Sequence, residues 1–307
     1  MKQKTKKKIL IAGGTGFIGY HLAKSSIKKG LKVTSISLSF PKKNRFIKKV
    51  KYITCDLSKK NLLKKKIKGN FDFVVNTSGH VDHKNKIKVY RSHFVGSKNL
   101  IDFFLKKNLT SFVQISSSME YGKIKSPHSE NFKCKPLSYY GISKNLATKY
   151  LIEKVNKKKF PGVILRLYQI YGHNQDPNRL ISSTILGCIN DRVINCSHGR
   201  QERDFLFIED LISAIFKALV TKNAIGNIFN IGLSAPIKVK RVVNKIKHII
   251  RKGKPVFGMK SLRKEENLKI YPNINKAKKI LKWRPKFSFS KGINLTINSY
   301  LKDFKKY

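Results

Sequence analysis

Short apolar runs alternate along the chain with longer segments in which apolar residues recur at helical spacing. The first run, residues 9–12, is unbroken, as expected of a strand buried on both faces of a parallel sheet. The amphipathic segments favour helices packed against that sheet. The alternation predicts a doubly wound α/β fold. The expected strands cover residues 9–12, 32–37, 50–56, 71–79, 111–118, 163–168 and 227–232, and the expected helices 20–29, 59–66, 87–107 and 211–220.

Three glycines follow the first expected strand at intervals of three residues and lead into the first helix. Residues 8–19 read Lys-Ile-Leu-Ile-Ala-Gly-Gly-Thr-Gly-Phe-Ile-Gly. Gly13 permits a tight turn, Gly16 lets the backbone approach a pyrophosphate, and Gly19 lets the helix lie close to the sheet. The pyrophosphate would bind the free amides at the helix N-terminus. Any sharp strand-to-helix turn can use such glycines, so the confirming feature is an acidic residue about 20 residues on.

That acidic residue is absent. The second strand ends at Ser37, and Lys42, Lys43 and Arg45 follow it. A hydroxyl and three bases suit a 2′-phosphate, and they would leave a bare ribose 2′-hydroxyl without its usual acceptor. We therefore predict NADP as the cofactor, with NAD as the alternative. In a chain so rich in lysine, the missing carboxylate is the stronger part of this argument.

The ends of the next strands are also polar. Asp56 ends the third strand and could accept a hydrogen bond from an adenine amino group, or it could cap the helix at residues 59–66. The fourth strand ends in small residues, Ser78 among them, where the cofactor would lie. The fifth ends in three hydroxyls, residues 116–118. Ligands bind beyond the C-terminal ends of such strands.

Composition narrows the choice of partners. With 307 residues the chain can bury a full core, and its 67 Lys and Arg against 16 Asp and Glu give a formal net charge of +51. Such a charge can drive nonspecific nucleic-acid binding. The lysines are scattered from Lys2 to Lys306, however, and no RNA-binding or zinc-finger pattern accompanies them. We interpret the charge as a solvated surface that attracts anionic substrates and cofactors, and we expect no nucleic-acid partner.

Cysteine spacing and hydropathy indicate a reduced, cytoplasmic setting. The four cysteines are too far apart for a metal knuckle or a redox pair, so we expect no metal site and no disulfide framework. The Lys-rich start lacks the long apolar core of a signal peptide. No stretch reaches the roughly 18 apolar residues that span a bilayer, so we expect no membrane association.

The candidate chemistry lies at Tyr140 and Lys144. Four residues apart, they share one face of a helix about 6 Å apart along its axis. Lowering the pKa of a phenol from near 10 to neutrality needs roughly 4 kcal/mol of phenolate stabilisation, which a neighbouring ammonium and an oxidised nicotinamide could supply. Ser117, at a strand end, could hydrogen-bond the substrate oxygen. The pair has little weight alone, since Tyr139 also lies beside lysines but off the face of Lys144.

Five segments, taken as a set, carry a resemblance. They are Gly13-Gly-Thr-Gly-Phe-Ile-Gly19, Asp56-Leu57, Ser116-Ser-Ser-Met-Glu-Tyr-Gly122, Tyr140 to Lys144, and Arg203-Asp-Phe-Leu-Phe-Ile-Glu-Asp-Leu211. Their order and spacing resemble the extended short-chain dehydrogenase/reductase family, whose members act on nucleotide sugars as epimerases, 4,6-dehydratases and ketoreductases. The resemblance implies a Rossmann-type sheet with a smaller, interleaved C-terminal substrate-binding domain.

The resemblance also implies residue roles. Tyr140 would be the general acid/base, Lys144 would tune it and hold the nicotinamide ribose, and Ser117 would orient the reacting hydroxyl or carbonyl. Together with the arguments above, the expected cofactor-binding residues are Gly13, Gly16, Phe17, Ile18, Gly19, Ser37, Lys42, Asp56, Leu57, Ser78, Tyr140 and Lys144, and the expected substrate-binding residues are Ser117, Asn178, Arg179, Arg203 and Arg263.

Where this chain departs from the family pattern, the differences favour some of the family's activities over others. Dehydratases carry an Asp-Glu pair where this chain has Ser118-Met119, which argues against dehydration. Epimerases usually hold NAD through an acidic residue at the position of Ser37. We therefore predict an NADPH-dependent reductase of a nucleotide-linked 4-keto-6-deoxyhexose. The alternative is a 4-epimerase that retains NAD. A third hypothesis is a non-catalytic Rossmann-type regulator or nucleic-acid binder. The family tends to have Asn where His93 stands, and the pattern assigns that histidine no role.

Domain and assembly expectations complete the prediction. Residues 1–168, with a returning segment at about 205–232, should bind the dinucleotide, and residues 169–307 mainly the nucleotide sugar. Asp210 should cap the helix at residues 211–220. The resemblance implies a homodimer built on a four-helix bundle that includes the helix of Tyr140.

Overall fold

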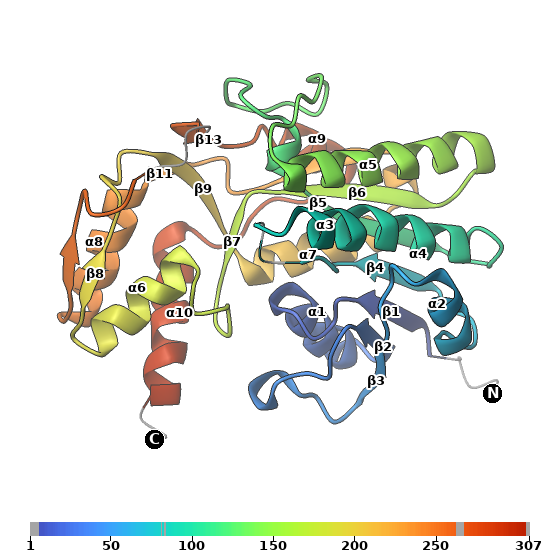
Figure 1. The fold of residues 1–307 in the computed structure, drawn as a ribbon, viewed down its shortest axis with the longest axis horizontal. Helices are drawn as coiled ribbons and strands as arrows, with labels where there is room; N and C mark the ends of the chain where they lie inside the picture. The colour runs from blue at the N-terminus through green and yellow to red at the C-terminus, as the bar shows by residue number, and fades with distance from the viewer. Residues whose placement is uncertain (1–5, 81, 83, 262–266, 305–307) are drawn as a thin grey trace.

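A parallel sheet of seven strands forms the larger part of the computed structural model, which describes residues 6–304 except 81, 83 and 262–266 (Figure 1). The strand order is β10-β6-β5-β4-β1-β2-β3. This confirms the predicted doubly wound, Rossmann-type sheet, whose order reverses between β1 and β4, where ligands bind in such folds. The strands are β1 (Lys8–Ala12), β2 (Lys32–Ser37), β3 (Val50–Thr54), β4 (Phe73–Asn76), β5 (Ser111–Ser117), β6 (Gly162–Leu167) and β10 (Ile228–Ile231).

Both faces of this sheet are buried, which explains why its strands are unbroken apolar runs. Ile9 and Ile11 of β1 enter one core, and Leu10 enters the other. Leu22 and Leu211 close the first core, while Leu63, Leu100 and Leu151 close the second. The helices that supply these residues are α1 (Phe17–Lys28) and α7 (Ile208–Val220) for the first core, and α2 (Lys60–Lys66), α4 (Gly96–Phe104) and α5 (Tyr139–Lys158) for the second.

A smaller lobe lies beyond the C-terminal end of β6, on the left of Figure 1. The chain enters this lobe after β6, returns to the large sheet for α7 and β10, and then leaves again. In the smaller sheet β9 lies between β11 and β13 and also pairs with β7. The elements of the lobe are β7 (Gln169–Tyr171), α6 (Leu180–Ile189), β8 (Val193–Asn195), β9 (Glu202–Phe207), β11 (Pro236–Lys238), α8 (Val239–Ile250), β12 (Lys254–Val256), β13 (Lys269–Ile270) and α10 (Phe289–Phe304), and α9 (Asn275–Ile280) packs beside β10.

The helix predicted at residues 87–107 is present from Lys86 to Phe104, but it is not a regular α-helix throughout. The segment is divided into α3 (Lys86–Tyr90), a π-helical turn (Arg91–Val95) and α4. Apolar spacing cannot reveal such a turn, because one wider turn leaves most apolar residues on the same face. The π-turn contains His93, and turns of this kind are frequent at functional sites.

The predicted capping role of Asp210 is also wrong. Helix α7 begins at Ile208, so Asp210 already lies in its first turn. The buried Asp210 carboxylate instead accepts hydrogen bonds from the backbone amides of Lys286 and Phe287, at 2.8 and 3.0 Å. The Trp283 indole donates to the Asp210 backbone carbonyl at 3.2 Å. Asp210 therefore fastens the C-terminal segment to α7, a contact that local sequence does not reveal.

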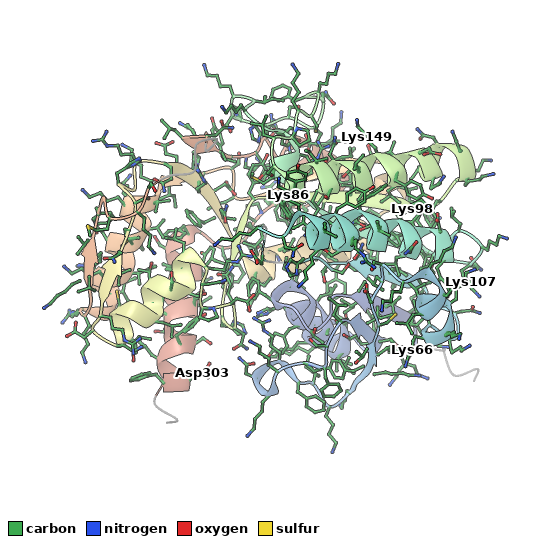
Figure 2. The ribbon with its side chains drawn as sticks, in the orientation of Figure 1. Lys66, Lys86, Lys98, Lys107, Lys149 and Asp303 are labelled. Atoms are coloured by element: carbon green, nitrogen blue, oxygen red, sulfur yellow. The ribbon has the colours of Figure 1, made fainter. Side chains whose placement is uncertain are left out.

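Lysines project from many elements of the surface. Figure 2 labels Lys66, Lys86, Lys98, Lys107 and Lys149, which lie on or beside four different helices. No helix in the described part of the chain is long and apolar enough to cross a membrane.

Candidate active site

The turn between β1 and α1 is packed so closely that two of its glycines cannot carry a side chain. Gly13 has φ +81°, and a Cβ there would lie 2.8 Å from the Cα of Ser78. A Cβ on Gly19 would lie 2.2 Å from the carbonyl oxygen of Gly13. By contrast, a Cβ on Gly16 would approach only that same oxygen, at 3.3 Å. Gly16 precedes α1 and offers no side-chain cap, so no capping side chain occupies the first amides of the helix, which begins after β1 at the switch point of the sheet. This arrangement fits a dinucleotide pyrophosphate.

The residues expected around the adenosine have partners of their own. Ser37 is buried, and its hydroxyl accepts a hydrogen bond from the Thr15 amide at 3.3 Å. Asp56 accepts from the amide and hydroxyl of Ser58, at 2.9 and 2.8 Å, so it forms a turn. The expectation that Asp56 caps the helix is wrong, because the capping position of α2 is Lys59. Lys42 is exposed.

Arg45 is not available as a free base after the second strand. Its side chain is buried, and its guanidinium donates to the Asn174 carbonyl at 2.5 Å and to an Asp176 carboxylate oxygen at 2.9 Å. A second contact lies nearby, where the His21 ring meets His173 at a centroid distance of 4.4 Å. These contacts join the first part of the chain to the loop that precedes α6.

The three predicted catalytic residues lie together. Ser117 ends β5, and Ser138 caps α5 by accepting from the Gly141 amide, so that Tyr140 and Lys144 lie in its first turns. The Ser117 hydroxyl accepts from the Met119 amide at 3.2 Å and hydrogen-bonds Tyr140. The Lys144 ammonium donates to the Ile115 carbonyl at 2.8 Å and lies 5.9 Å from the centre of the Tyr140 ring. The structure thus brings the trio to the C-terminal end of the parallel strands.

The surroundings of Tyr140 and Lys144 shift their proton affinities. Burial lowers the pKa of Lys144 to about 8, although the negative charge of Glu120 acts in the opposite direction. Burial raises the pKa of Tyr140, while the Ser117 hydrogen bond and the charge of Arg179 lower it and Glu120 raises it. The phenol therefore needs further positive charge before it can ionise near neutrality.

His93 is a site residue to which sequence reasoning assigned no role. The histidine is buried in the π-turn, and its ring meets the Tyr140 ring edge to face at a centroid distance of 4.9 Å. Its Nε2 lies 3.1 Å from the His80 carbonyl oxygen. A Cβ on Gly79 would lie 1.9 Å from the His93 ring, so Gly79 leaves room for that ring. The only signal in the sequence was an unusual residue at this position.

The expected substrate-binding residues lie on separate elements, unlike the catalytic trio. Asn178 and Arg179 are exposed in the loop before α6, and the charge of Arg179 acts on the Tyr140 phenol. Arg203 on β9 is buried and donates to the carbonyls of Glu202 and Leu268, at 2.8 and 3.3 Å. Arg263 lies outside the described residues. The described residues contain no group of acidic, histidine and cysteine side chains that could hold a metal ion.

Comparisons with known proteins agree with this geometry. Residues 9–232 match the model of the NAD dependent epimerase/dehydratase family. A putative UDP-glucose 4-epimerase of Methanocaldococcus jannaschii is 30% identical over 302 residues, which cover 94% of this chain and 97% of the relative. A dTDP-D-glucose 4,6-dehydratase of Dictyostelium discoideum is 29% identical, over 79% of this chain and 62% of the relative.

Solved structures resemble the whole chain. A UDP-glucose 4-epimerase of Thermotoga maritima with UDP-glucose has a TM-score of 0.90 at 23% identity, covering 97% of this chain and 99% of that one. A UDP-glucuronic acid 4-epimerase of Bacillus cereus, in complex with UDP-glucuronic acid and NAD, has a TM-score of 0.86 at 25% identity, covering 96% and 99%.

Proposed function

Because the chain belongs to the NAD-dependent epimerase/dehydratase family, we propose that it is a nucleotide-sugar 4-epimerase that retains NAD through the reaction. Membership makes it an enzyme of the extended short-chain dehydrogenase/reductase type, as the sequence predicted. The observation that carries the proposal is the convergence of Ser117, Tyr140 and Lys144 at the edge of the parallel sheet where the glycine turn after β1 also lies. Relatives named as UDP-glucose epimerases, and a similar epimerase structure with NAD, support the narrower assignment.

The chain's own residues would move and hold one proton. Tyr140 would take the proton from a sugar hydroxyl and later return it, while Ser117 orients that oxygen. Lys144 would stabilise the phenolate by its charge, since the ammonium lies beside the ring. When bound at residues 13–19, the dinucleotide would supply hydride acceptance and return. An epimerase needs no further acid or base at the neighbouring carbon.

Dehydration is a poorer fit to the same site. Loss of a hydroxyl together with a C5 proton needs a second acid–base pair beyond Tyr140. The chain has Ser118 and Met119 where family dehydratases carry Asp and Glu, and a thioether cannot exchange protons at neutral pH. Met119 is 39% exposed.

The burial of Arg45 removes one of the three bases expected to meet a 2′-phosphate, while Lys42 and Lys43 stay exposed. A 2′-phosphate would need a base able to turn toward it, and the Arg45 guanidinium is buried against Asn174 and Asp176. That contact also holds two loops together beside the expected adenosine site.

One observation still favours the NADPH-dependent reductase predicted from the sequence. Ser37 ends β2 without the carboxylate that usually accepts from a bare ribose 2′-hydroxyl, and exposed Lys42 lies close by in the chain. We keep a 4-keto-6-deoxyhexose reductase as the second candidate for this reason.

The two candidates differ in what happens to the nicotinamide. We expect purified protein to interconvert UDP-glucose and UDP-galactose without added cofactor and with no net change in absorbance at the NADH band. Denaturing the protein should release NAD, identified by mass spectrometry. Stoichiometric NADPH oxidation with a nucleotide-linked 4-keto-6-deoxyhexose, and no hexose interconversion, would instead establish the reductase.

Two neighbouring helices, α3 and α5, expose apolar side chains. We propose a homodimer through α3 and α5, because Ile87, Tyr90 and Ile142 on these helices are 71%, 43% and 38% exposed. Apolar side chains left exposed on neighbouring helices suit an interface. We also propose a cytoplasmic enzyme, with its four cysteines free as the structure has them.

Activity should fall as the pH rises above about 8. Lys144 has its pKa lowered to about 8, so above that pH it loses the charge that stabilises the Tyr140 phenolate. Deprotonation of Lys144 does not destabilise the folded protein, so unfolding caused by this residue cannot explain the loss of activity. Its folded-state pKa lies below the ordinary value of 10.5, so between these values the unfolded chain binds more protons and stability rises with pH. The measurement is kcat/KM against pH with parallel thermal melts, and a flat profile from pH 7 to 9.5 would contradict it.

A further inference from the structure

A fully buried ion pair lies close to the catalytic trio. Glu120 is 0% exposed and Arg166 is 3% exposed. Two nitrogens of the Arg166 guanidinium, Nε and one terminal nitrogen, donate to the same Glu120 oxygen, at 3.1 and 2.9 Å. Burying two charges is unfavourable unless the remaining oxygen is also hydrogen-bonded. The other Glu120 oxygen is also hydrogen-bonded, and its partners indicate the structural role of the ion pair.

The second oxygen of Glu120 joins the strand of Ser117 to the helix of Tyr140. It accepts hydrogen bonds from the Ser116 hydroxyl and, at 3.0 Å, from the Thr148 hydroxyl. Ser116 immediately precedes Ser117 on β5, and Thr148 follows Lys144 by four residues on α5, so it lies on the same helix face. One carboxylate therefore contacts three elements, since Arg166 belongs to β6.

We propose that Glu120 is a positioning residue that holds α5 in register with β5, and thereby sets the distance between Ser117 and Tyr140. The inference deepens the proposed function, because it concerns how that site is assembled. Glu120 itself is fully buried, and its hydrogen bonds join Ser116, Thr148 and Arg166 and not the trio.

Two further contacts show that α5 packs closely against β5 and the turn after it. A Cβ on Gly141 would lie 2.5 Å from the Met119 carbonyl oxygen, so α5 lies directly against the short turn Ser118–Glu120. The Lys144 ammonium donates to Ile115 on β5 at 2.8 Å. Because Ser117 and Tyr140 belong to different elements, a shift of α5 along β5 changes their separation. A misplacement of about 1 Å between reacting groups can cost a hundred-fold in rate.

Thr148 offers the cleanest test, because its replacement leaves the ion pair intact. In Thr148→Val the carboxylate still binds Arg166 and Ser116, and α5 loses its hydrogen bond to Glu120 together with a longer one, at 3.3 Å, to the Ser116 hydroxyl. We expect kcat to fall about ten-fold with KM and the affinity for NAD unchanged, since only the geometry of proton transfer is altered. Thr148→Ser keeps the hydroxyl and should restore kcat.

The matched control is another buried hydroxyl on the same helix. Ser143 donates within α5, to the Tyr139 carbonyl at 2.7 Å, and its hydroxyl therefore does not tie α5 to β5. Ser143→Ala should therefore keep kcat. A Thr148→Val protein that melts at a lower temperature but turns over at the wild-type rate would overturn the proposal, because Glu120 would then act on stability alone.

Glu120→Asp tests the residue itself without removing its charge. The shorter side chain can stay paired with Arg166 but cannot reach Ser116 and Thr148 as well, so kcat should fall at least as far as in Thr148→Val, again at constant NAD affinity. If Glu120→Asp retains full kcat, the proposal is wrong. Turnover is followed by whichever of the two proposed activities the wild-type protein has, so the effect on kcat is read separately from the choice between epimerase and reductase.

Discussion

Replacement of Tyr140 by phenylalanine is expected to lower kcat about a thousand-fold, within the range that general acid–base groups contribute. The change removes the phenolic oxygen and leaves the aromatic ring, which packs edge to face against His93. Lys144 keeps its own hydrogen bond to Ile115. The affinities for NAD and for the nucleotide sugar should therefore stay unchanged. Steady-state kinetics and calorimetric titration of the same preparation measure both quantities.

The neighbouring tyrosine provides the control. Tyr139 is 51% exposed, and its ring lies beneath the Lys86 ammonium at 4.5 Å from the centroid. Tyr139→Phe therefore removes a hydroxyl from the same helix turn, outside the site, and should retain wild-type kcat. If Tyr140→Phe kept more than a tenth of the activity, another group would have to carry the proton.

The sheet could be predicted because each strand has a local sequence signal, a short run rich in apolar residues. Strand β1 is apolar on both faces, and the glycine turn after it restricts what may follow. The trio was also within reach, but only because the spacing of Tyr140 and Lys144 and the strand end at Ser117 were combined with the family resemblance of five segments. Such features depend on residues close together in the chain.

The errors and omissions concern contacts between distant segments. Arg45 seemed a free base until the fold brought Asp176 to it from 131 positions along the chain. Asp210 seemed a helix cap until the backbone at Lys286 proved to be its partner, 76 positions away. Glu120 was counted only within a motif, and its ion pair with Arg166 depends on how β5 and β6 lie together. No local pattern encodes these pairings.

Gly19 should be the position in the cofactor cradle least able to accept a side chain. A single methyl group there would lie 2.2 Å from the Gly13 carbonyl oxygen and 2.5 Å from the Gly14 Cα. Both contacts are with backbone, which cannot rotate away as a side chain can. Relief requires α1 to move by about an ångström from the turn, because unbonded carbon and oxygen atoms rest more than 3 Å apart.

Such a movement displaces the helix amides that would bind the pyrophosphate. We therefore expect Gly19→Ala to weaken NAD binding by at least about a hundred-fold, or about 2.8 kcal/mol, measured by titration of cofactor-free protein. Gly30→Ala is the control at the other end of α1. Gly30 has φ +78° with no atom within 4 Å of a Cβ, so alanine there strains the backbone and lowers stability without touching the turn. The two variants should therefore differ in their affinity for NAD, which only Gly19→Ala should lose. Equal NAD affinity in the wild type and in Gly19→Ala would show that this turn does not hold the dinucleotide.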